Sequence, residues 1–367
     1  MSGFHQVLAL NCGSSSLKYA LFRDEDVVVR GAVNVGAGGA PDHGAAVHGV
    51  LDDVDRHGVG PPDAVGHRLV HGGPDHLEPE RVTAELLASL ARVVPFAPLH
   101  LPAELRAIEA VSARLGAVPQ VVCFDTAFHR TLPQRARRFA LPGSLFDAGV
   151  RRYGFHGLSY EYVVELLGPP RLEHAVLAHL GSGASMVAVR DGRSIDTTMG
   201  FTPTGGLVMG TRSGDLDPGL LVYLLEHRGY DARGLDRLVN HEAGLLGLSG
   251  TTPDMQRLLQ QRSTDERAAL AVDVFCYQAR KWIGAFAAAL EGLDALVFTG
   301  GIGENAPEVR REICRGLGHL GVALDDARNV AGEKVISSDV SACVAYVVRT
   351  DEEEMVARHT RQALGES

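Results

Sequence analysis

The most conspicuous shortage in this sequence is lysine. Only Lys18, Lys281 and Lys334 are lysines, so 32 of the 35 basic residues are arginines. The 45 acidic residues leave a formal net charge of −10. General binders of nucleic acid or of acidic membranes need an excess of positive charge, so we expect neither as a partner. Among the three lysines, Lys18 draws attention because it lies in a Gly/Ser-rich segment.

Cysteines and long apolar runs are also scarce. The five cysteines, Cys12, Cys123, Cys276, Cys314 and Cys343, are odd in number and show no CxxC spacing. This pattern predicts buried free thiols and argues against a disulfide framework or a zinc site. The longest candidate membrane span, 282–298, is interrupted by Glu291 and Asp294. The N-terminus carries no basic segment followed by an apolar run, so we expect a cytoplasmic protein without a signal peptide.

What is present is the composition and pattern of an α/β protein. At 367 residues and 45% hydrophobic content, the chain is long enough for two domains. Residues 7–10 read as a buried strand, 11–16 as a Gly/Ser hairpin loop and 17–22 as a second strand. The same sequence of strand, Gly/Ser loop, strand and Arg-Asp turn recurs over 176–192. This repetition predicts two related halves.

Alternating helices and strands fill the rest of the chain. Apolar positions at helical spacing predict helices over 80–94, 102–115, 220–228 and 266–290, and short apolar runs predict strands over 120–124, 295–298 and 345–348. Glycines and polar residues follow several of these strands. In α/β folds the carboxyl ends of parallel strands meet at one edge of the sheet, where ligands bind. We therefore expect the ligand-binding and catalytic residues in these segments.

The loop from Asn11 to Lys18 suits a phosphate group. Its small residues let backbone N–H groups approach phosphate oxygens, and its hydroxyls add further donors. Lys18 supplies a point charge, and Asn11 can orient a metal ion or its bound water. The alternative is an ordinary polar hairpin with Lys18 on a solvated strand face.

Two arginines stand in glycine-rich segments. Arg68 precedes a Gly-Gly turn near a strand end, and Arg212 lies between Gly210 and Gly214. A guanidinium group there can bind an anion in a bidentate manner, whereas a structural ion pair is the alternative for Arg68. Two such arginines are useful if two anions must be brought together. Transfer of a phosphoryl group to a carboxylate poses that problem.

Four further positions are candidates. His156 lies in a Gly-Phe-His-Gly segment, and His179 opens the second Gly/Ser loop. Asp125 ends a strand, where it can serve chemistry or cap a helix. The acidic run 352–354 is either part of a site or the first turn of the last helix. The glycine-rich segment 299–305 follows a buried strand and would suit a nucleotide.

Taken in chain order, these segments resemble the acetate kinase family, within the superfamily of sugar kinases, actin and heat-shock chaperones. The matching segments are Leu8-Ala-Leu-Asn-Cys-Gly-Ser-Ser-Ser-Leu-Lys18, Gly66-His-Arg-Leu-Val-His-Gly-Gly73, Phe124-Asp-Thr-Ala-Phe-His129, Arg152-Tyr-Gly-Phe-His-Gly157, Met199-Gly-Phe-Thr-Pro203, Met209-Gly-Thr-Arg-Ser-Gly-Asp215, Gly300-Gly-Ile-Gly-Glu-Asn305 and Thr350-Asp-Glu-Glu353. The ordered set is far more specific than any single member. It covers almost the whole chain.

The resemblance implies an architecture and an activity. The fold would be α/β, with two duplicated actin-like ATPase domains and a central cleft. Residues 1–127 with 351–367 would form an acyl- and phosphate-binding domain completed by the C-terminal helix, and residues 128–350 a nucleotide-binding and dimerisation domain. The reaction would be reversible, Mg²⁺-dependent transfer between ATP and acetate, giving acetyl phosphate and ADP, with Mn²⁺ as the alternative ion. The protein would be a homodimer.

The resemblance also implies roles for individual residues. The catalytic residues would be Asp125, His156 and Arg212, and the metal site would use Asn11 and Glu352. The carboxylate and its acyl tail would meet Arg68, Val70, Leu99, Phe155 and Pro203. The phosphates would meet Ser14, Ser16, Lys18, His179, Leu180, Gly181, Ser182 and Gly183. The adenosine would meet Asp254, Met255, Gln256, Gly301, Ile302, Gly303, Glu304 and Asn305.

Several positions depart from the family pattern. Ser182 replaces the asparagine of the second phosphate loop, and Tyr160 the histidine that ends the Gly-Phe-His-Gly-Thr-Ser-His segment. Leu101 replaces the asparagine of a His-Asn-Pro element, and Gln256 an arginine near the adenine. These changes keep two alternatives open. One is a kinase for propionate or another short-chain acid, and the other is a catalytically weak, nucleotide-binding regulator of the same fold.

Overall fold

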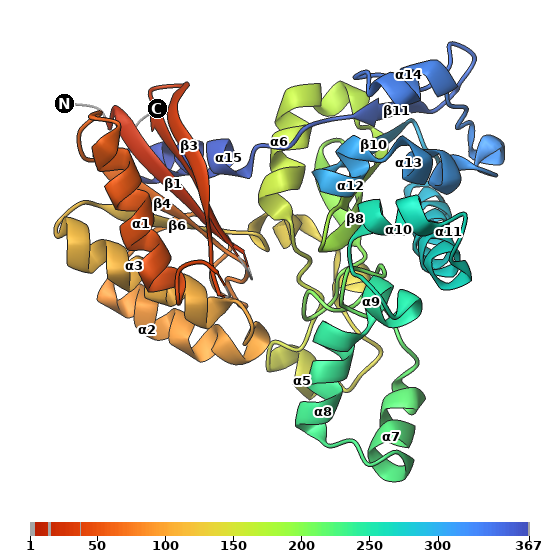
Figure 1. Ribbon diagram of the computed structural model, residues 1–367, viewed down its shortest axis with the longest axis horizontal. Coiled ribbons are helices and arrows are strands. Elements are labelled where there is room, and N and C mark those ends of the chain that lie inside the picture. The colour runs from red at the N-terminus through yellow and green to blue at the C-terminus, as the bar shows by residue number, and fades with distance from the viewer. Residues whose placement is uncertain (1–3, 14–15, 37, 366–367) are drawn as a thin grey trace. The chain divides into compact units, whose positions relative to one another are not determined.

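The computed structural model describes residues 4–13, 16–36 and 38–365, and these form two compact units (Figure 1). The first unit draws on the ranges Met1–Arg130, Phe155–Tyr162 and Asp351–Ser367, and the second on Thr131–Gly154 and Val163–Thr350. The predicted assignment of acyl and phosphate binding to one domain, and of nucleotide binding and dimerisation to the other, stays a prediction.

The first unit is built on a six-stranded sheet with the order β3-β2-β1-β4-β6-β5. Its strands are β1 (Gln6–Cys12), β2 (Ser16–Arg23), β3 (Asp26–Asn34), β4 (Ala64–Leu69), β5 (Glu80–Arg81) and β6 (Gln120–Phe124). The strands β1 and β2 form the predicted antiparallel hairpin, and β1, β4 and β6 run parallel. The carboxyl ends of these three strands therefore meet at one edge of the sheet.

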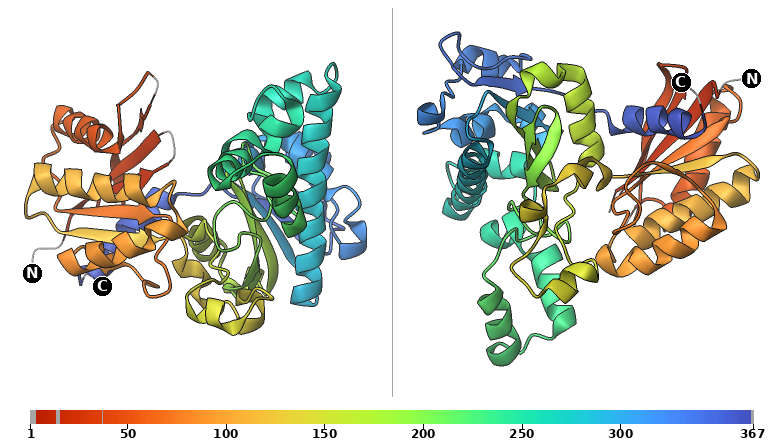
Figure 2. Two further views of the ribbon diagram at one scale, coloured as in Figure 1. Left: turned by 90° about the horizontal axis from the view of Figure 1, so that it is seen from below. Right: turned by 180° about the vertical axis from the view of Figure 1, so that it is seen from behind.

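The core of this unit consists of two layers of side chains, one on each face of the sheet. Figure 2 shows the red and orange strands of this sheet with their neighbouring helices. Leu8 and Leu10 face the layer under α1 (His43–Arg56) and α3 (Leu101–Leu115). Val7 and Ala9 face the opposite layer, which α15 (Glu352–Ala363) covers. This is the period of two expected for a strand buried on both faces. The last helix of the chain thus completes the first unit.

The second unit repeats this topology. Its sheet has the order β11-β10-β7-β8-β9, with strands β7 (His174–Leu180), β8 (Ala184–Arg190), β9 (Arg193–Thr197), β10 (Ala295–Thr299) and β11 (Val344–Val347). The strands β7 and β8 form the second predicted hairpin, and β7, β10 and β11 run parallel. The expectation of two related α/β halves is confirmed in the sheet topology.

The helices complete both units. The first also contains α2 (Ala84–Val93) and the beginning of α6 (Gly157–Leu167). The second contains α4 (Gln134–Arg137), α5 (Gly143–Asp147), α7 (Pro218–His227), α8 (Ala232–Arg237), α9 (Gly244–Ser249), α10 (Met255–Gln261), α11 (Glu266–Leu290), α12 (Gly300–Asn305), α13 (Pro307–Cys314) and α14 (Asp326–Ala331). The bounds of α11 are those predicted, and its start is fixed by the Asp265 side chain, which caps it. No helix within the described ranges is long and apolar enough to cross a membrane.

One local prediction was wrong. Residues 80–94 were expected to be one helix, but Glu80 pairs antiparallel with Val122 of β6, and α2 begins only after Thr83, whose hydroxyl accepts a hydrogen bond from the Leu86 N–H. The pairing with the sheet overrides the helical pattern of the first residues. The glycine-rich segment 299–305 contains the short helix α12. The five cysteines are buried free thiols, as predicted.

Candidate active site

Three polar side chains converge at the strand ends of the first unit. Asn11 lies near the end of β1, Arg68 near the end of β4, and Asp125 directly after β6. Asn11 and Arg68 are opposite each other in the parallel register. The topology alone therefore brings together residues that are far apart in sequence.

Arg68 is the centre of this cluster. Its Nε and Nη2 donate to the two carboxylate oxygens of Asp125, at 3.1 and 2.5 Å, and its Nη1 donates to Asn11 Oδ1 at 3.2 Å. Burial would lower the pKa of Arg68, but the carboxylates of Asp125 and Glu352 raise it above its ordinary value, so the side chain stays charged. The ion pair considered as the structural alternative for Arg68 is present. Since a guanidinium has five N–H donors, two remain after these contacts with the described residues.

The C-terminal helix adds two carboxylates. Asn11 Nδ2 donates to Glu352 Oε2 and Glu353 Oε1, both at 2.9 Å, and Glu352 Oε2 lies 3.5 Å from Arg68 Nε. Both glutamates stand in the first turn of α15, where the helix dipole favours negative charge. The acidic run is thus both a helix first turn and part of the cluster.

Asp125 is completely buried, and Arg68 is not its only hydrogen-bond donor. Its Oδ2 also accepts the N–H of His156 at 3.3 Å. Burial raises its pKa to about 6, with Arg68 opposing this shift and Glu352 adding to it. His156 adopts φ +59°, uncommon for a non-glycine residue, and an ideal Cβ at Gly157 would lie 2.0 Å from the Asp125 carbonyl oxygen. Asp125 therefore orients Arg68 and also holds the His156 segment, which leads into α6.

The first phosphate-type hairpin borders this cluster. Ser14 lies outside the described residues. The Gly13 N–H donates to the Ser16 carbonyl at 2.8 Å, and Lys18 pairs with Asn11 across the β1–β2 ladder. Directly paired residues project from the same face of a sheet. The ammonium group of Lys18 is accordingly among the groups that act on the pKa of Glu353, which burial raises and Lys18 lowers.

The residues predicted for an acyl tail fall in both units. Val70 and Phe155 are buried in the first unit, and the ring of His71, the residue after Val70, has its centroid 5.5 Å from that of Phe155. Leu99, in the same unit, is 40% exposed. Pro203 belongs to the second unit.

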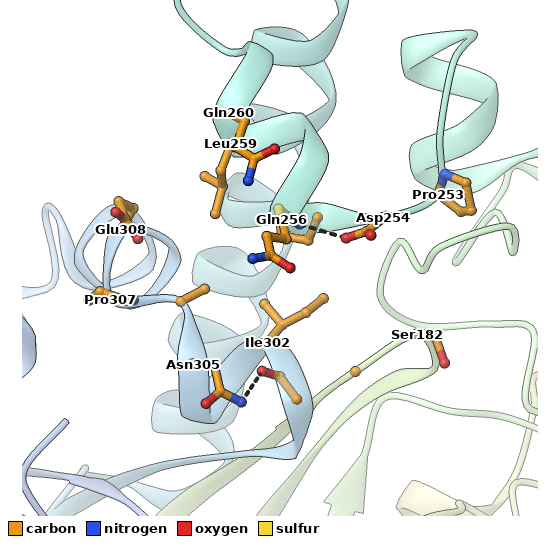
Figure 3. Close-up of a pocket in the computed structure, with 14 residues that line it drawn as sticks. Ser182, Pro253, Asp254, Gln256, Leu259, Gln260, Ile302, Asn305, Pro307 and Glu308 are labelled. Atoms are coloured by element: carbon orange, nitrogen blue, oxygen red, sulfur yellow. Dashed lines mark hydrogen bonds between the residues drawn. The ribbon is translucent and has the colours of Figure 1, made fainter.

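The second unit contains a cavity of about 960 Å³ between α10, α12 and the loop after β7 (Figure 3). It is lined by Gly181, Ser182, Pro253, Asp254, Met255, Gln256, Leu259, Gln260, Gly301, Ile302, Asn305, Ala306, Pro307 and Glu308. Eight of these fourteen residues belong to the predicted nucleotide set. A cavity of this volume, lined by both polar and apolar side chains, suits a nucleotide-sized ligand.

Two hydrogen bonds orient polar side chains that line the cavity. The Asp254 side chain caps α10 by accepting the N–H of Gln256 at 2.8 Å, and Asn305 Nδ2 donates to the Gly301 carbonyl at 2.9 Å. The side chains of Gln256 and Ile302 extend toward the space between α10 and α12 (Figure 3). Cavity-facing donors and acceptors thus come from the ends of two helices.

Of the nucleotide residues predicted in the second unit, five do not line the cavity: His179, Leu180, Gly183, Gly303 and Glu304. Leu180 and Gly303 are buried, and Glu304 Oε1 accepts the N–H groups of Gly300 and Thr350, at 3.0 and 3.3 Å. The Glu304 carboxylate therefore braces the segment after β10.

Six residues that line the cavity were not predicted from the sequence: Pro253, Leu259, Gln260, Ala306, Pro307 and Glu308. Leu259 and Gln260 follow Gln256 by three and four positions, the spacing that shares one helix face. That spacing could have identified them. Pro307 and Glu308 belong to the first turn of α13, for which the glycine pattern carries no signal.

Arg212 is half-buried in the second unit. Its Nη1 donates to the Pro203 carbonyl at 2.9 Å. Gly244, at φ +64°, would place a Cβ only 2.2 Å from the Met209 carbonyl oxygen and 2.7 Å from that of Arg212. Only glycine fits there, so α9 packs directly on the segment that carries Arg212.

The first-unit cluster fits a magnesium ion by its chemistry. The carboxylates of Asp125 and Glu352 contact the Arg68 guanidinium group, and the Asn11 amide donates to the carboxylates of Glu352 and Glu353. Carboxylate and amide oxygens are the ligands Mg²⁺ prefers, and it needs only one or two carboxylates when substrate phosphates and water complete its shell. Within the described ranges, no group of three or more His, Cys, Asp or Glu residues could hold a metal ion, so an ion here would depend on such a shared shell.

Known proteins resemble this chain both in sequence and in fold. A sequence profile described as the Acetokinase family matches residues 6–358. The chain is 44% identical to the acetate kinase of Micrococcus luteus, covering 96% of this chain and 98% of that protein. It resembles the crystal structure of Porphyromonas gingivalis acetate kinase (39% identity, 98% and 99% of the two chains, TM-score 0.88). It also resembles a propionate kinase from Francisella tularensis (35% identity, 97% and 99% of the two chains, TM-score 0.91).

These solved structures are matched over their whole length, so the two units of this chain correspond to the fold of those kinases. The chain belongs to the acetokinase family.

Proposed function

We propose that this chain transfers the γ-phosphoryl group of ATP to acetate, reversibly, giving acetyl phosphate and ADP. The observation that carries the proposal is the buried Arg68, oriented by Asp125 at a strand end, with the apolar Val70 two residues away. A guanidinium that still has N–H donors available, close to an apolar side chain such as Val70, suits a short carboxylic acid. Membership of a family whose relatives are named acetate kinase supports the same reaction.

The chemistry needs positioning more than proton transfer. Acetate is already ionised near neutral pH, so no general base has to create the nucleophile. Both oxygens of Asp125 accept hydrogen bonds from Arg68, which makes Asp125 a positioning group and not a proton acceptor. Phosphoryl transfer of this kind depends on alignment and on stabilising charge in the transition state. We therefore infer direct in-line transfer.

The remaining roles follow from charge and location. The two further N–H groups of Arg68 would bind the carboxylate. Arg212 and His156 would stabilise the equatorial oxygens of the migrating phosphoryl group. Ser16, Lys18 and the segment 179–183 would bind the phosphates, and the cavity beside Gln256 would bind the adenosine.

Asn11 and Glu352 would hold the magnesium ion, with Mn²⁺ as an alternative. When bound, this ion supplies positive charge to the phosphate oxygens of the nucleotide. Asn11 already orders both Glu352 and Glu353 through its amide group, so the chain itself fixes the carboxylates on which such an ion depends.

A kinase for propionate is the second candidate, and the likeness to a propionate kinase structure favours it. One methylene group in an apolar pocket changes kcat/KM by about 1–3 kcal/mol of transition-state free energy. Relative kcat/KM values for acetate, propionate and butyrate would separate the two enzymes.

The proposed function is tested by offering acetate, propionate and butyrate against ATP, GTP and pyrophosphate, and trapping any acyl phosphate with hydroxylamine. We expect acetyl hydroxamate with acetate and ATP, and little product with pyrophosphate. Nucleotide binding without any acyl phosphate would contradict the proposal and support the regulator alternative.

We also infer a homodimer formed through the second unit. Helix α7 has no buried residue, and its apolar side chains Leu220, Val222, Tyr223 and Leu225 are 40–52% exposed. Apolar side chains gathered on one exposed helix are typical of a subunit interface. A second copy of this chain would cover them.

A further inference from the structure

Glu104 is a buried carboxyl group that none of the roles above uses. It stands in the first turn of α3 and is 1% exposed. Its Oε2 accepts the backbone N–H of Val70 at 3.0 Å. Its Oε1 is buried and has no hydrogen-bond partner among the described residues. Leaving a buried oxygen unpaired is costly, so a residue that does so needs an explanation.

The Val70 N–H lies where the sheet stops. The Leu69 carbonyl still accepts the Asp125 N–H at 2.9 Å, but β4 ends at Leu69. Without Glu104, the Val70 N–H would be a buried donor that the sheet ladder does not satisfy. The single bond from Glu104 therefore ties the strand end to α3.

This bond links two segments that are proposed to meet the substrate. Val70 stands two residues after Arg68 in the chain, and Leu99 stands two residues before the start of α3. Glu104 thus sets the position of one apolar contact, Val70, relative to the segment that carries the other, Leu99. A change at Glu104 would move these groups without removing any of them.

The groups around the Glu104 carboxyl group also influence its protonation. The charged and titratable groups that face it are Arg68 from β4, Asp125 after β6 and Cys12 at the end of β1. Burial raises the pKa of Glu104 to about 8, and Arg68 and the Val70 N–H oppose this rise. At neutral pH the group is therefore mostly protonated. Glutamine is its close neutral mimic.

We propose that Glu104 is a positioning residue that fixes the backbone at Val70, and thereby sets the affinity and chain-length preference for the carboxylic acid substrate. This inference rests on the proposed function, because it concerns the acid-binding side of the same site. Glu104 touches no reacting atom; it acts through Val70 and through the potential at Arg68.

Two substitutions separate the hydrogen bond from the charge. Glu104→Met keeps a similar volume but offers no acceptor, so the Val70 N–H is left unsatisfied. We expect it to raise the acetate KM about tenfold, the effect of one unsatisfied buried donor, and to change the propionate-to-acetate ratio of kcat/KM. The ATP KM should stay within about twofold. Glu104→Gln keeps the acceptor and should restore an acetate KM within about threefold of that of the unmodified protein.

Ser112→Ala is the matched control. Ser112 lies two turns further along α3, and its hydroxyl accepts a hydrogen bond at 2.8 Å from Nε2 of Gln120, which begins β6 at the end away from Asp125. Its loss should lower stability without altering either KM or the substrate ratio. A purely structural role for Glu104 would give the same result as this control.

A pH series keeps the proposal testable if Glu104→Met does not fold. Between about pH 7 and about pH 9, ionisation of Glu104 weakens the positive potential at Arg68, so the acetate KM of the unmodified protein should rise. In Glu104→Gln this rise should be absent. Equal pH profiles, or an unchanged acetate KM and substrate ratio in a folded Glu104→Met, would overturn the inference. Absence of acyl phosphate from the unmodified protein would instead refute the proposed function itself.

Discussion

At the scale of single residues, Arg68 and Asp125 form a buried ion pair on which both the fold and the proposed chemistry depend. Both side chains are removed from water, and the pair is tolerated because the fork of Arg68 matches the two oxygens of Asp125. Removing one partner leaves the other as an uncompensated buried charge. After these two hydrogen bonds and the one to Asn11, two N–H donors of Arg68 remain for the proposed carboxylate substrate, so the orientation of the pair matters more than its strength.

Asp125→Asn should lower kcat/KM for acetate by at least about a hundredfold, because the neutral amide no longer holds Arg68 in its bidentate orientation. The hydroxamate assay measures this loss. Asp63→Asn is the control, since Asp63 accepts the Gln6 N–H at an exposed position. Activity of Asp125→Asn within about threefold of the unmodified protein would contradict the positioning role.

The acid limb of the pH profile should reflect Asp125. Its pKa in the folded protein is about 6, raised from an ordinary value of 3.8 mainly by burial. Between these values the folded state binds more protons than the unfolded state, so for this group the free energy of unfolding increases as pH falls. We therefore expect kcat/KM to decline below about pH 6 while circular dichroism still reports a folded protein. A decline that follows unfolding would exclude Asp125 as its cause.

At the scale of elements, the contact between β4 and α15 decides how the first unit is closed. An ideal Cβ at Gly66 would lie 2.2 Å from Thr360 Oγ1 and 2.6 Å from Val356 Cγ1. The helix therefore approaches the strand more closely than any side chain at position 66 would allow. Glu352 and Glu353 reach Asn11 because α15 is seated in this way.

Gly66→Ala should lower the free energy of unfolding by about 1–3 kcal/mol, because the helix must shift to admit a methyl group. Urea denaturation measures the effect. Gly284→Ala is the control: this glycine is inside α11, and an ideal Cβ there would meet nothing within 4 Å, so alanine should be neutral or stabilising. Equal stability of the two variants would show that α15 can move without cost.

Sequence patterns predicted the repeated hairpins and α11 because the signals for these elements are local. The start of α2 was predicted wrongly because Glu80 and Arg81 form a ladder with a strand about forty residues later. Arg68 and Asp125 were both recognised, but their bidentate pairing depends on which strands are neighbours in the sheet. Glu104 gave no signal, because an acidic residue in the first turn of a helix is ordinary, and its partner is a distant backbone N–H.

At the scale of the whole molecule, the two units have related sheets with parallel strands. The residues at the carboxyl ends of these strands differ between the units. The first unit gathers charged groups around Arg68, and the second offers the cavity lined by α10 and α12. The scarcity of lysine does not mark this difference between the units. Lys18 lies in the first hairpin, and the second hairpin has no lysine at the corresponding place. Assembly into a dimer belongs to the same scale.

Val222→Glu should convert the proposed dimer into a monomer, because a carboxylate at the centre of an apolar interface would be desolvated without a partner. Sedimentation velocity measures the assembly state. Val340→Glu should leave it unchanged, since Val340 is 90% exposed at a separate place in the same unit. A monomeric unmodified protein, or a dimeric Val222→Glu, would show that α7 is not the interface.

The position of α15 after the strands of both units also determines an order of events during synthesis. The β-strands of the first unit leave the ribosome early, but the helix that covers one face of their sheet is translated only after the strands of the second unit. The second unit, which ends at Thr350, has all its strands available before then. The unit that begins the chain therefore finishes folding last, and a nascent or truncated chain without α15 would expose Val7, Ala9 and Val121 to non-native association.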